Sequence, residues 1–166
     1  MNYAVVYSSQ TGNTARLARE IGAALPAARC VYSGPPDEKA LDAPLIFAGF
    51  WTDKGGCAPE MQAFLERLRG KQVFLFGTAG FGGSEDYFAR ILDRVEQCLD
   101  SSNMVAGRYM CQGRMPPAVR RRYEAMLPAA PEKARALLEN FDRALPHPDK
   151  EDLEGLRRAA AACAGA

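Results

Sequence analysis

The sequence predicts an α/β protein built on a doubly wound, five-stranded parallel sheet. Short apolar runs alternate with amphipathic segments through the first 110 residues. Strands that are apolar on both faces are typical of parallel sheets covered by helices on both sides. Polar, glycine-rich loops follow the first, third and fourth runs. Because ligands of such folds bind beyond the carboxyl ends of the strands, we expect a ligand site built from these three loops.

The apolar runs and helical stripes give the order of the elements. Strands are expected at residues 2–7, 30–32, 44–49, 73–76 and 103–109. Apolar side chains at helical spacing predict helices over residues 17–25, 61–68 and 84–99. Residues 116–166 are predicted to form a helical C-terminal extension, with stripes at 119–127 and 134–145 and a weaker helix around 153–156. The length of 166 residues predicts a single domain, 1–166.

The overall charge and hydropathy exclude several classes of function. The 21 Lys and Arg against 20 Asp and Glu give a net charge of +1, which provides no field to attract nucleic acid or an anionic membrane. No run of about 18 apolar residues predicts a membrane span. The N-terminus has neither the basic nor the apolar region of a signal peptide, so we expect a cytoplasmic protein.

The histidine and cysteine content excludes most hydrolytic and metal chemistry. His147 is the only histidine, so neither a Ser-His-Asp triad nor a two-histidine metal site can form. The five cysteines contain no CxxC pair and are interpreted as reduced, buried side chains. Cys57 and Cys111 each follow a predicted strand and could lie near one edge of the sheet, but a redox thiol is the less favoured interpretation. We predict no catalytic residue and no metal ligand.

The loop after the first strand has the composition of a phosphate cradle. It surrounds a glycine with hydroxyl and amide side chains and leads directly into a helix: Ser9, Gln10, Thr11, Gly12, Asn13 and Thr14. The first amides of a helix are unpaired, and the helix dipole favours an anion. The loop lacks the lysine of a nucleotide-triphosphatase loop, so a monophosphate fits it better. The alternative is a capped helix start that binds no ligand.

This loop resembles the phosphate loop of the flavodoxin family, whose pattern is Ser/Thr-x-Thr-Gly-x-Thr. Residues 9–14 follow the pattern in the same strand–loop–helix context. The resemblance covers most of residues 1–110. It implies a flavodoxin-like sheet of strand order 2-1-3-4-5 with extra C-terminal helices, and FMN as the cofactor. Residues 50–55 also resemble the Phe-Trp-x-Asp-Lys-Gly loop of small bacterial members of the family, one group of which accompanies a bilirubin-reducing enzyme.

The resemblance implies that the other two loops contact the flavin ring. Trp51 matches the aromatic residue of the loop after the third strand, with Phe50 beside it, and Phe81 matches that of the loop after the fourth strand. Offset stacking on aromatic faces suits a flat ring. Trp51 and Phe81 could instead only anchor their own loops. The other residues expected to bind the cofactor are Thr52, Lys54, Gly55, Gly77, Thr78, Ala79 and Gly80.

Two charged features depart from the acidic surroundings usual in the family. Lys54 would raise the reduction potential of the flavin if it lies close to the ring, or it is a solvated lysine paired with Asp53. Residues 108–122 contain five arginines and no acid, whereas residues 84–100 are rich in acids. We favour a solvated helix face for the arginines. The alternatives are a docking patch for an acidic redox partner and a site for a carboxylate or nucleotide phosphate.

The favoured function is an FMN-binding electron carrier, a monomer or weak dimer. It would take electrons from a reductase or ferredoxin and pass them to a reductive enzyme as acceptor. The three loops offer no substrate acid or base, so a carrier is preferred to an enzyme in its own right. The first alternative is an NAD(P)H-dependent flavin or quinone reductase on the same fold, in which the C-terminal helices form a lid or dimer interface. The second is a binding protein that has lost the flavin.

Overall fold

The computed structural model describes residues 1–82 and 84–165 and contains a five-stranded parallel sheet in the order β2-β1-β3-β4-β5. The predicted fold class and strand order are confirmed. β5 ends at Gln112 rather than at residue 109, because Met110 and Cys111 continue its apolar run. The strands are β1 (Tyr3–Tyr7), β2 (Cys30–Gly34), β3 (Leu45–Trp51), β4 (Gln72–Ala79) and β5 (Met104–Gln112).

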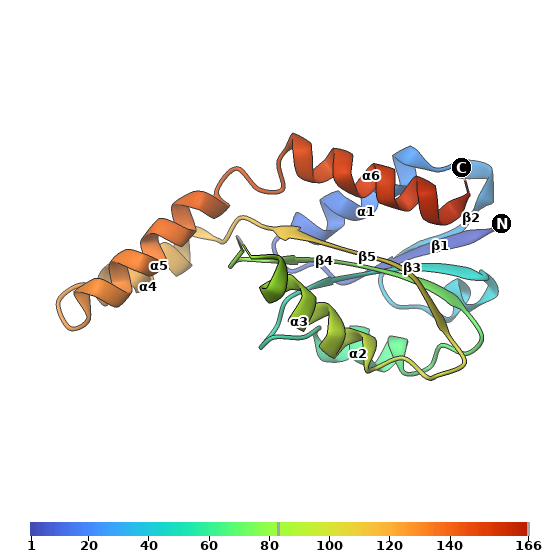
Figure 1. The fold of residues 1–166 in the computed structure, drawn as a ribbon, viewed down its shortest axis with the longest axis horizontal. Coiled ribbons are helices and arrows are strands. Elements are labelled where there is room, and N and C mark those ends of the chain that lie inside the picture. The colour runs from blue at the N-terminus through green and yellow to red at the C-terminus, as the bar shows by residue number, and fades with distance from the viewer. Residues whose placement is uncertain (83, 166) are drawn as a thin grey trace.

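Helices cover both faces of the sheet. α1 (Asn13–Ala24) and α6 (Lys150–Ala164) lie on one face, and α2 (Pro59–Leu65) and α3 (Glu85–Glu96) lie on the other (Figure 1). Short 3-10 helices precede β2 (Ala27–Arg29) and β3 (Glu38–Asp42). Two apolar cores result, one between the sheet and each helical layer. None of the helices in the described residues is long and apolar enough to cross a membrane.

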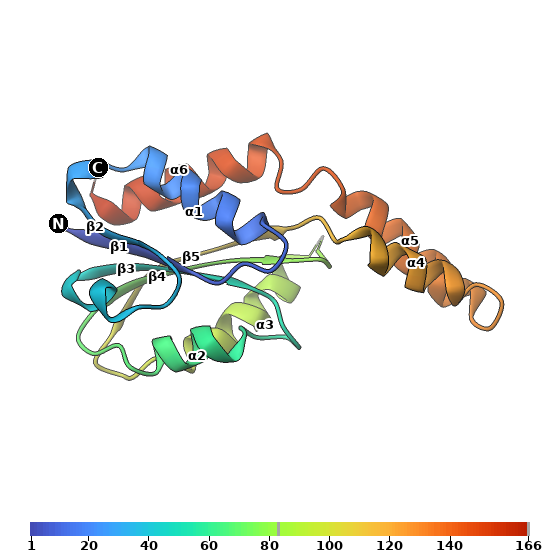
Figure 2. The same ribbon diagram turned by 180° about the vertical axis from the view of Figure 1, so that it is seen from behind.

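The last helix, α6, was predicted to be a weak helix in a C-terminal extension, and the structure places it differently. Leu153, Leu156 and Ala160 of α6 are buried in the same core as Leu17 and Ile21 of α1. α6 is therefore a covering helix of the sheet, and the extension is limited to α4 (Pro117–Ala125) and α5 (Pro131–Ala144). These two helices pack against each other as a hairpin that projects beyond the carboxyl ends of the strands (Figures 1 and 2). We call this hairpin, residues 117–144, the arm.

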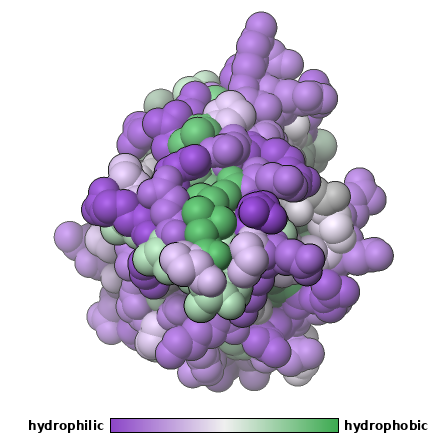
Figure 3. Space-filling model, turned by 90° about the vertical axis from the view of Figure 1, so that its left-hand side faces the viewer, coloured by the Kyte–Doolittle hydropathy of each residue, from purple (hydrophilic) through white to green (hydrophobic). Residues whose placement is uncertain are grey.

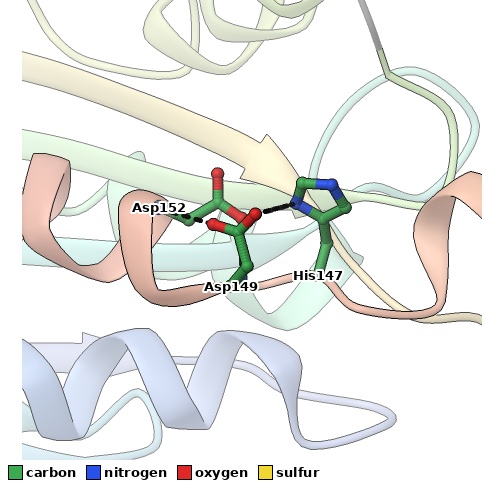
Figure 4. A group of neighbouring side chains, drawn as sticks. All are labelled: His147, Asp149 and Asp152. Atoms are coloured by element: carbon green, nitrogen blue, oxygen red, sulfur yellow. Dashed lines mark hydrogen bonds and ion pairs between the residues drawn. The ribbon is translucent and has the colours of Figure 1, made fainter.

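α6 begins at a capping box that also holds the single histidine. The Asp149 side chain accepts a hydrogen bond from Asp152 N at 2.9 Å, and the Asp152 side chain accepts one from Asp149 N at 2.8 Å. His147 Nδ1 lies 2.6 Å from the same Asp152 oxygen (Figure 4). Because both carboxylates already accept backbone amides, the group fixes the start of α6 and the turn that leads into it.

Replacing Asp149 with alanine should lower the free energy of unfolding by about 1 kcal/mol at neutral pH, because α6 loses its N-cap. The backbone hydrogen bond from Asp152 holds the pKa of the Asp149 carboxyl below its usual value. Its contribution is therefore complete above the unfolded pKa and is lost as the pH falls through the lower folded pKa. In urea unfolding, the difference between wild type and D149A should be constant above about pH 5 and shrink below about pH 4. An equal difference at every pH would contradict this assignment.

Candidate functional site

Backbone hydrogen bonds continue the sheet beyond its strands and hold the starts of the loops after β1, β3 and β5 beside the neighbouring strands. In each bond, the first residue after a strand donates its backbone N–H to a carbonyl oxygen of the neighbouring strand. The bonds run from Ser8 N to Gly49 O, from Thr52 N to Thr78 O and from Gly113 N to Ala79 O, at 2.9 to 3.0 Å. A cavity of about 740 Å³ lies between the loops that follow β1, β3, β4 and β5. Its position at the carboxyl edge is the one predicted from the sequence.

Most of the predicted cofactor-binding residues line this cavity. Eleven of the sixteen do so: Gln10, Thr11, Asn13, Trp51, Thr52, Lys54, Gly55, Thr78, Ala79, Gly80 and Phe81. Ser9 and Gly12 line a neighbouring cavity of about 420 Å³. Thr14, Phe50 and Gly77 line neither of these two cavities. That these residues bind a cofactor stays a prediction.

Phe50 is a core residue, which corrects the expectation that its ring faces the cavity. Its side chain is 1% exposed, and a Cβ atom built on Gly77 would lie 2.5 Å from Phe50 Cζ. Gly77 is thus required by the close approach of this ring. Because successive side chains of a strand point to opposite faces, Trp51 is directed away from that core and is half-buried at the cavity.

The loop after β1 leaves its backbone donors available beside the cavity. Gly12 has a φ of 92° and precedes α1 without a side-chain cap of its own. Ser9 Oγ accepts a hydrogen bond from Ala15 N at 3.1 Å. Among the described residues, the amide N–H groups of residues 10–14 have no hydrogen-bond partner. Five amide donors at the positive end of a 12-residue helix form a suitable environment for an anion.

A buried pair of hydroxyl groups joins this loop to β4. Thr14 Oγ1 lies 3.0 Å from Thr78 Oγ1, and both residues are buried. We expect Thr14→Val to lower the free energy of unfolding by about 1–3 kcal/mol, because it leaves the Thr78 hydroxyl buried without a partner. The double variant T14V/T78V should be closer to wild type than T14V alone. Chemical denaturation of the two variants tests this, and simple addition of two single losses would contradict it.

The loop after β3 turns tightly at the edge of the cavity. Asp53 and Gly56 exchange backbone hydrogen bonds of 2.9 and 3.0 Å around Lys54 (φ 50°) and Gly55 (φ 79°). This is a two-residue turn with both central residues left-handed, which favours glycine at the second position. Arg94 Nη1 of α3 donates to Lys54 O at 3.1 Å and holds the turn. Among the described residues Lys54 forms no ion pair with Asp53, so the predicted alternative of a paired lysine is wrong.

A further wall of the cavity was not predicted from the sequence. Tyr87 of α3 contributes to it, but most of it comes from the loop after β5 and from α4: Gly113, Arg114, Met115, Pro116, Ala118, Val119 and Arg122. We call these seven residues of the loop and of α4 the α4 wall. Asn13 Nδ2 donates to Arg114 O at 2.8 Å, which joins the wall to the first loop. Arg114 also donates from its backbone N to His147 O and from Nε to Leu145 O, at 2.9 and 2.7 Å. The glycine and proline between β5 and α4 were a signal of a loop at this edge.

The five arginines of residues 108–122 do not form one patch. Arg108 forms ion pairs with Asp93 and Glu96 of α3, so the acidic helix and the arginine stretch neutralise each other there. Arg120 is paired within the arm. Arg114 and Arg122 line the cavity, and Arg121 is exposed. The prediction that these arginines form a single solvated helix face is therefore wrong.

Cys57 and Cys111 do not lie beside each other at one edge of the sheet, which the sequence had allowed. Cys111 lies inside β5, in the core under α1 and α6, and burial raises its pKa. Cys57 packs against the opposite core beside Cys98, and burial raises its pKa to about 12. The two thiols thus lie on opposite faces of the sheet and cannot form a common site.

These features define a class of protein: a flavodoxin-like α/β domain with a cavity at the carboxyl edge of its sheet. The chain belongs to the flavodoxin domain family, whose model matches residues 4–161. It is 38% identical to the flavodoxin-like domain-containing protein BilS of Clostridium symbiosum (strain WAL-14163), over 92% of this chain and 90% of that protein.

Solved structures share the fold. Oxidised flavodoxin 2 from Bacillus cereus is similar with a TM-score of 0.64 and 21% identity, covering 99% of each chain. A flavoprotein from Lactobacillus acidophilus NCFM, solved in complex with FMN, is similar with a TM-score of 0.52 and 15% identity, covering 66% of this chain and 92% of that one.

Proposed function

We propose that this protein is an electron carrier that binds FMN in the cavity between the four loops. The observation that carries the proposal is the set of five amides of residues 10–14, which have no hydrogen-bond partner among the described residues and lie beside a cavity lined by Trp51 and Phe81. An anion site next to aromatic side chains suits a ligand with one phosphate and one flat ring. Family membership and the shared fold support a flavin cofactor.

The chain's own residues would divide the binding between them. The amides of residues 10–14 and the hydroxyl of Thr11 would hold the phosphate, and Trp51 would contact the ring. Phe81 is 41% exposed at the rim, which leaves that side open to a partner. Bound FMN supplies one- and two-electron chemistry. The described residues that line the cavity include no Asp, Glu, His or Cys, which supports a carrier whose chemistry belongs to the cofactor.

The direction of electron flow completes the proposal. A reductase or ferredoxin would act as donor and a reductive enzyme as acceptor. The loop of residues 50–55 resembles that of a group that accompanies a bilirubin-reducing enzyme, so such an enzyme is the first acceptor to test. A cytoplasmic location fits the five cysteines, which are all free in the structure.

A visible spectrum with added FMN, followed by reductive titration, tests the proposal. The purified protein should bind one FMN and, once reduced, should pass electrons to a partner enzyme. It should turn over NAD(P)H only when a separate reductase is supplied. A protein that stays colourless with excess FMN would overturn the proposal and favour the flavin-free alternative.

An NAD(P)H-dependent flavin or quinone reductase is the second candidate function. It is favoured by Arg114 and Arg122, which line the cavity and could bind a second phosphate. Direct oxidation of NADPH by the FMN-loaded protein, without any added reductase, would replace the carrier with this enzyme.

Replacing Lys54 with alanine should lower the two-electron potential of bound FMN by about 10–20 mV. Lys54 lines the cavity and is exposed, so its charge should contribute about 0.5–1 kcal/mol to the reduced, more anionic form. Arg29→Ala is the matched control, because Arg29 lies at the amino edge of the sheet and is exposed. Potentiometric titration of both variants tests the effect. An equal potential in K54A and wild type would exclude this role for Lys54.

A further inference from the structure

We propose that the arm is the docking surface for the acceptor protein and that it recognises an acidic patch on that protein. The inference rests on the proposed function and specifies the partner of the same cavity. It starts from the charges of the cavity. Its charged lining residues in the described part of the chain are Lys54, Arg114 and Arg122, and all three are basic. A partner that approaches the cavity therefore meets a positive surface.

The arm continues this positive surface because its acidic residues are mostly paired within it. Arg120 forms ion pairs with Glu124, at 3.0 Å, and with Asp142, and its guanidinium lies 5.5 Å from the centre of the Phe141 ring. Arg143 lies 3.7 Å from Glu139. Four exposed cations of the arm have no ion pair with any described residue: Arg121, Arg122, Lys133 and Arg135. Glu132 is the only acidic residue of the arm that has no ion pair with a described residue. The unpaired charges of the arm are therefore four positive and one negative.

A hydrogen bond joins the base of the arm to the loop after β4, which lines the cavity. This bond fixes the position of the arm relative to the cavity. Asn140 Nδ2 of α5 donates to Gly80 O at 3.1 Å, and Gln112 Nε2 donates to the same carbonyl at 2.9 Å. Val119 and Arg122 of α4 are themselves lining residues. A protein bound along α4 would therefore be held directly over the mouth of the cavity.

The shape and hydropathy of the arm favour a protein over a small ligand. The arm projects well beyond the sheet (Figure 1), and of its residues only those near the start of α4, such as Val119 and Arg122, line the cavity in the described part of the chain. Viewed from the arm's end, hydrophobic side chains gather in the middle of a mainly hydrophilic surface (Figure 3). Half-buried apolar residues of the arm include Met126, Leu127, Leu137 and Leu138. Apolar side chains surrounded by charged ones are typical of protein interfaces.

Charge reversal on the arm, away from the cavity, tests the inference. The variant R121E/R135E alters two exposed residues that do not line the cavity. The probes are an acidic and a basic cytochrome, both with potentials above that of the FMN-loaded protein. At low salt, the reduced wild type should transfer electrons faster to the acidic cytochrome, and added salt should slow this reaction. Electron transfer to the acidic cytochrome should be at least tenfold slower in R121E/R135E than in wild type. The control R29E, whose substitution lies at the opposite edge of the sheet, should react at the wild-type rate.

Binding of the oxidised protein gives a readout without electron transfer. Titration with the acidic cytochrome should shift backbone amide resonances of residues 117–135, and these shifts should be absent in R121E/R135E. Reoxidation by dioxygen, which is uncharged, should be equal in all three proteins. A faster reaction with the basic cytochrome, or equal rates in R121E/R135E and R29E, would overturn the docking surface while leaving FMN binding intact. A wild type that binds no FMN would instead overturn the proposed function.

Discussion

Replacing Thr11 with aspartate is expected to weaken FMN binding by about 100-fold while leaving riboflavin binding unchanged. Thr11 is exposed, lines the cavity and lies among the unpaired amides of the first loop. A carboxylate there would repel a phosphate held by these amides, and the size of the repulsion is taken for two charges about 4 Å apart. This Coulomb repulsion is roughly 4 kcal/mol at an effective dielectric near 20. Screening by solvent and salt reduces it to about 2.7 kcal/mol, which corresponds to a 100-fold loss of affinity. Riboflavin has no phosphate, so its affinity should be the same for T11D and for the wild type.

The matched control is Thr11→Asn, which changes the side chain by a similar volume without adding charge. It should bind FMN within a few-fold of wild type. Quenching of flavin fluorescence gives the affinity of each variant for both flavins. Equal losses for FMN and riboflavin in T11D would mean that the phosphate is held elsewhere.

Replacing Phe50 and replacing Trp51 should have opposite consequences, although the two residues are adjacent. Phe50→Ala should lower the free energy of unfolding by about 3–5 kcal/mol, because it removes a buried ring packed on Gly77. Trp51→Ala should cost less than about 2 kcal/mol, since Trp51 is only half-buried. FMN affinity should fall about tenfold or more in W51A, because a ring contact is lost.

Phe50→Leu provides the control for folding. It keeps an apolar side chain on the same core face and should bind FMN as wild type does, with a smaller loss of stability than F50A. Denaturant unfolding and flavin titration on the same samples separate the two effects. A tenfold loss of FMN affinity in a folded F50L would show that Phe50 contributes to the cavity after all.

The sheet and three of its loops were predictable because their signals are local. Short apolar runs such as 44–49 and 73–76, bounded by turn residues, are typical of buried parallel strands, and glycine-rich loops directly after such strands lie at the carboxyl edge. The role of Phe50 was not predictable in the same way. Phe50 and Trp51 are adjacent aromatic residues, and the alternation of the strand decides which of them faces the cavity.

The α4 wall and the role of α6 depend on contacts between distant parts of the chain. Arg114 reaches the cavity because Asn13, 101 residues away, binds its carbonyl oxygen. α6 carries few large apolar residues, so its pattern predicts only a weak helix. It is stabilised by burial of Leu153 and Leu156 against α1 and the sheet. Cys57 and Cys111 are separated because Cys111 lies inside β5 in the core under α1 and α6, whereas Cys57 packs against the core on the other face of the sheet.

Quenching of tryptophan fluorescence by FMN tests the central claim most directly. Trp51 is the single tryptophan of the chain and lines the cavity, so its emission reports on this site alone. We predict that FMN quenches it in a saturable manner with one FMN per chain, and that riboflavin does so only at much higher concentration. Saturable FMN binding that leaves the emission of Trp51 unchanged would contradict the account, because the flavin would then bind away from this cavity.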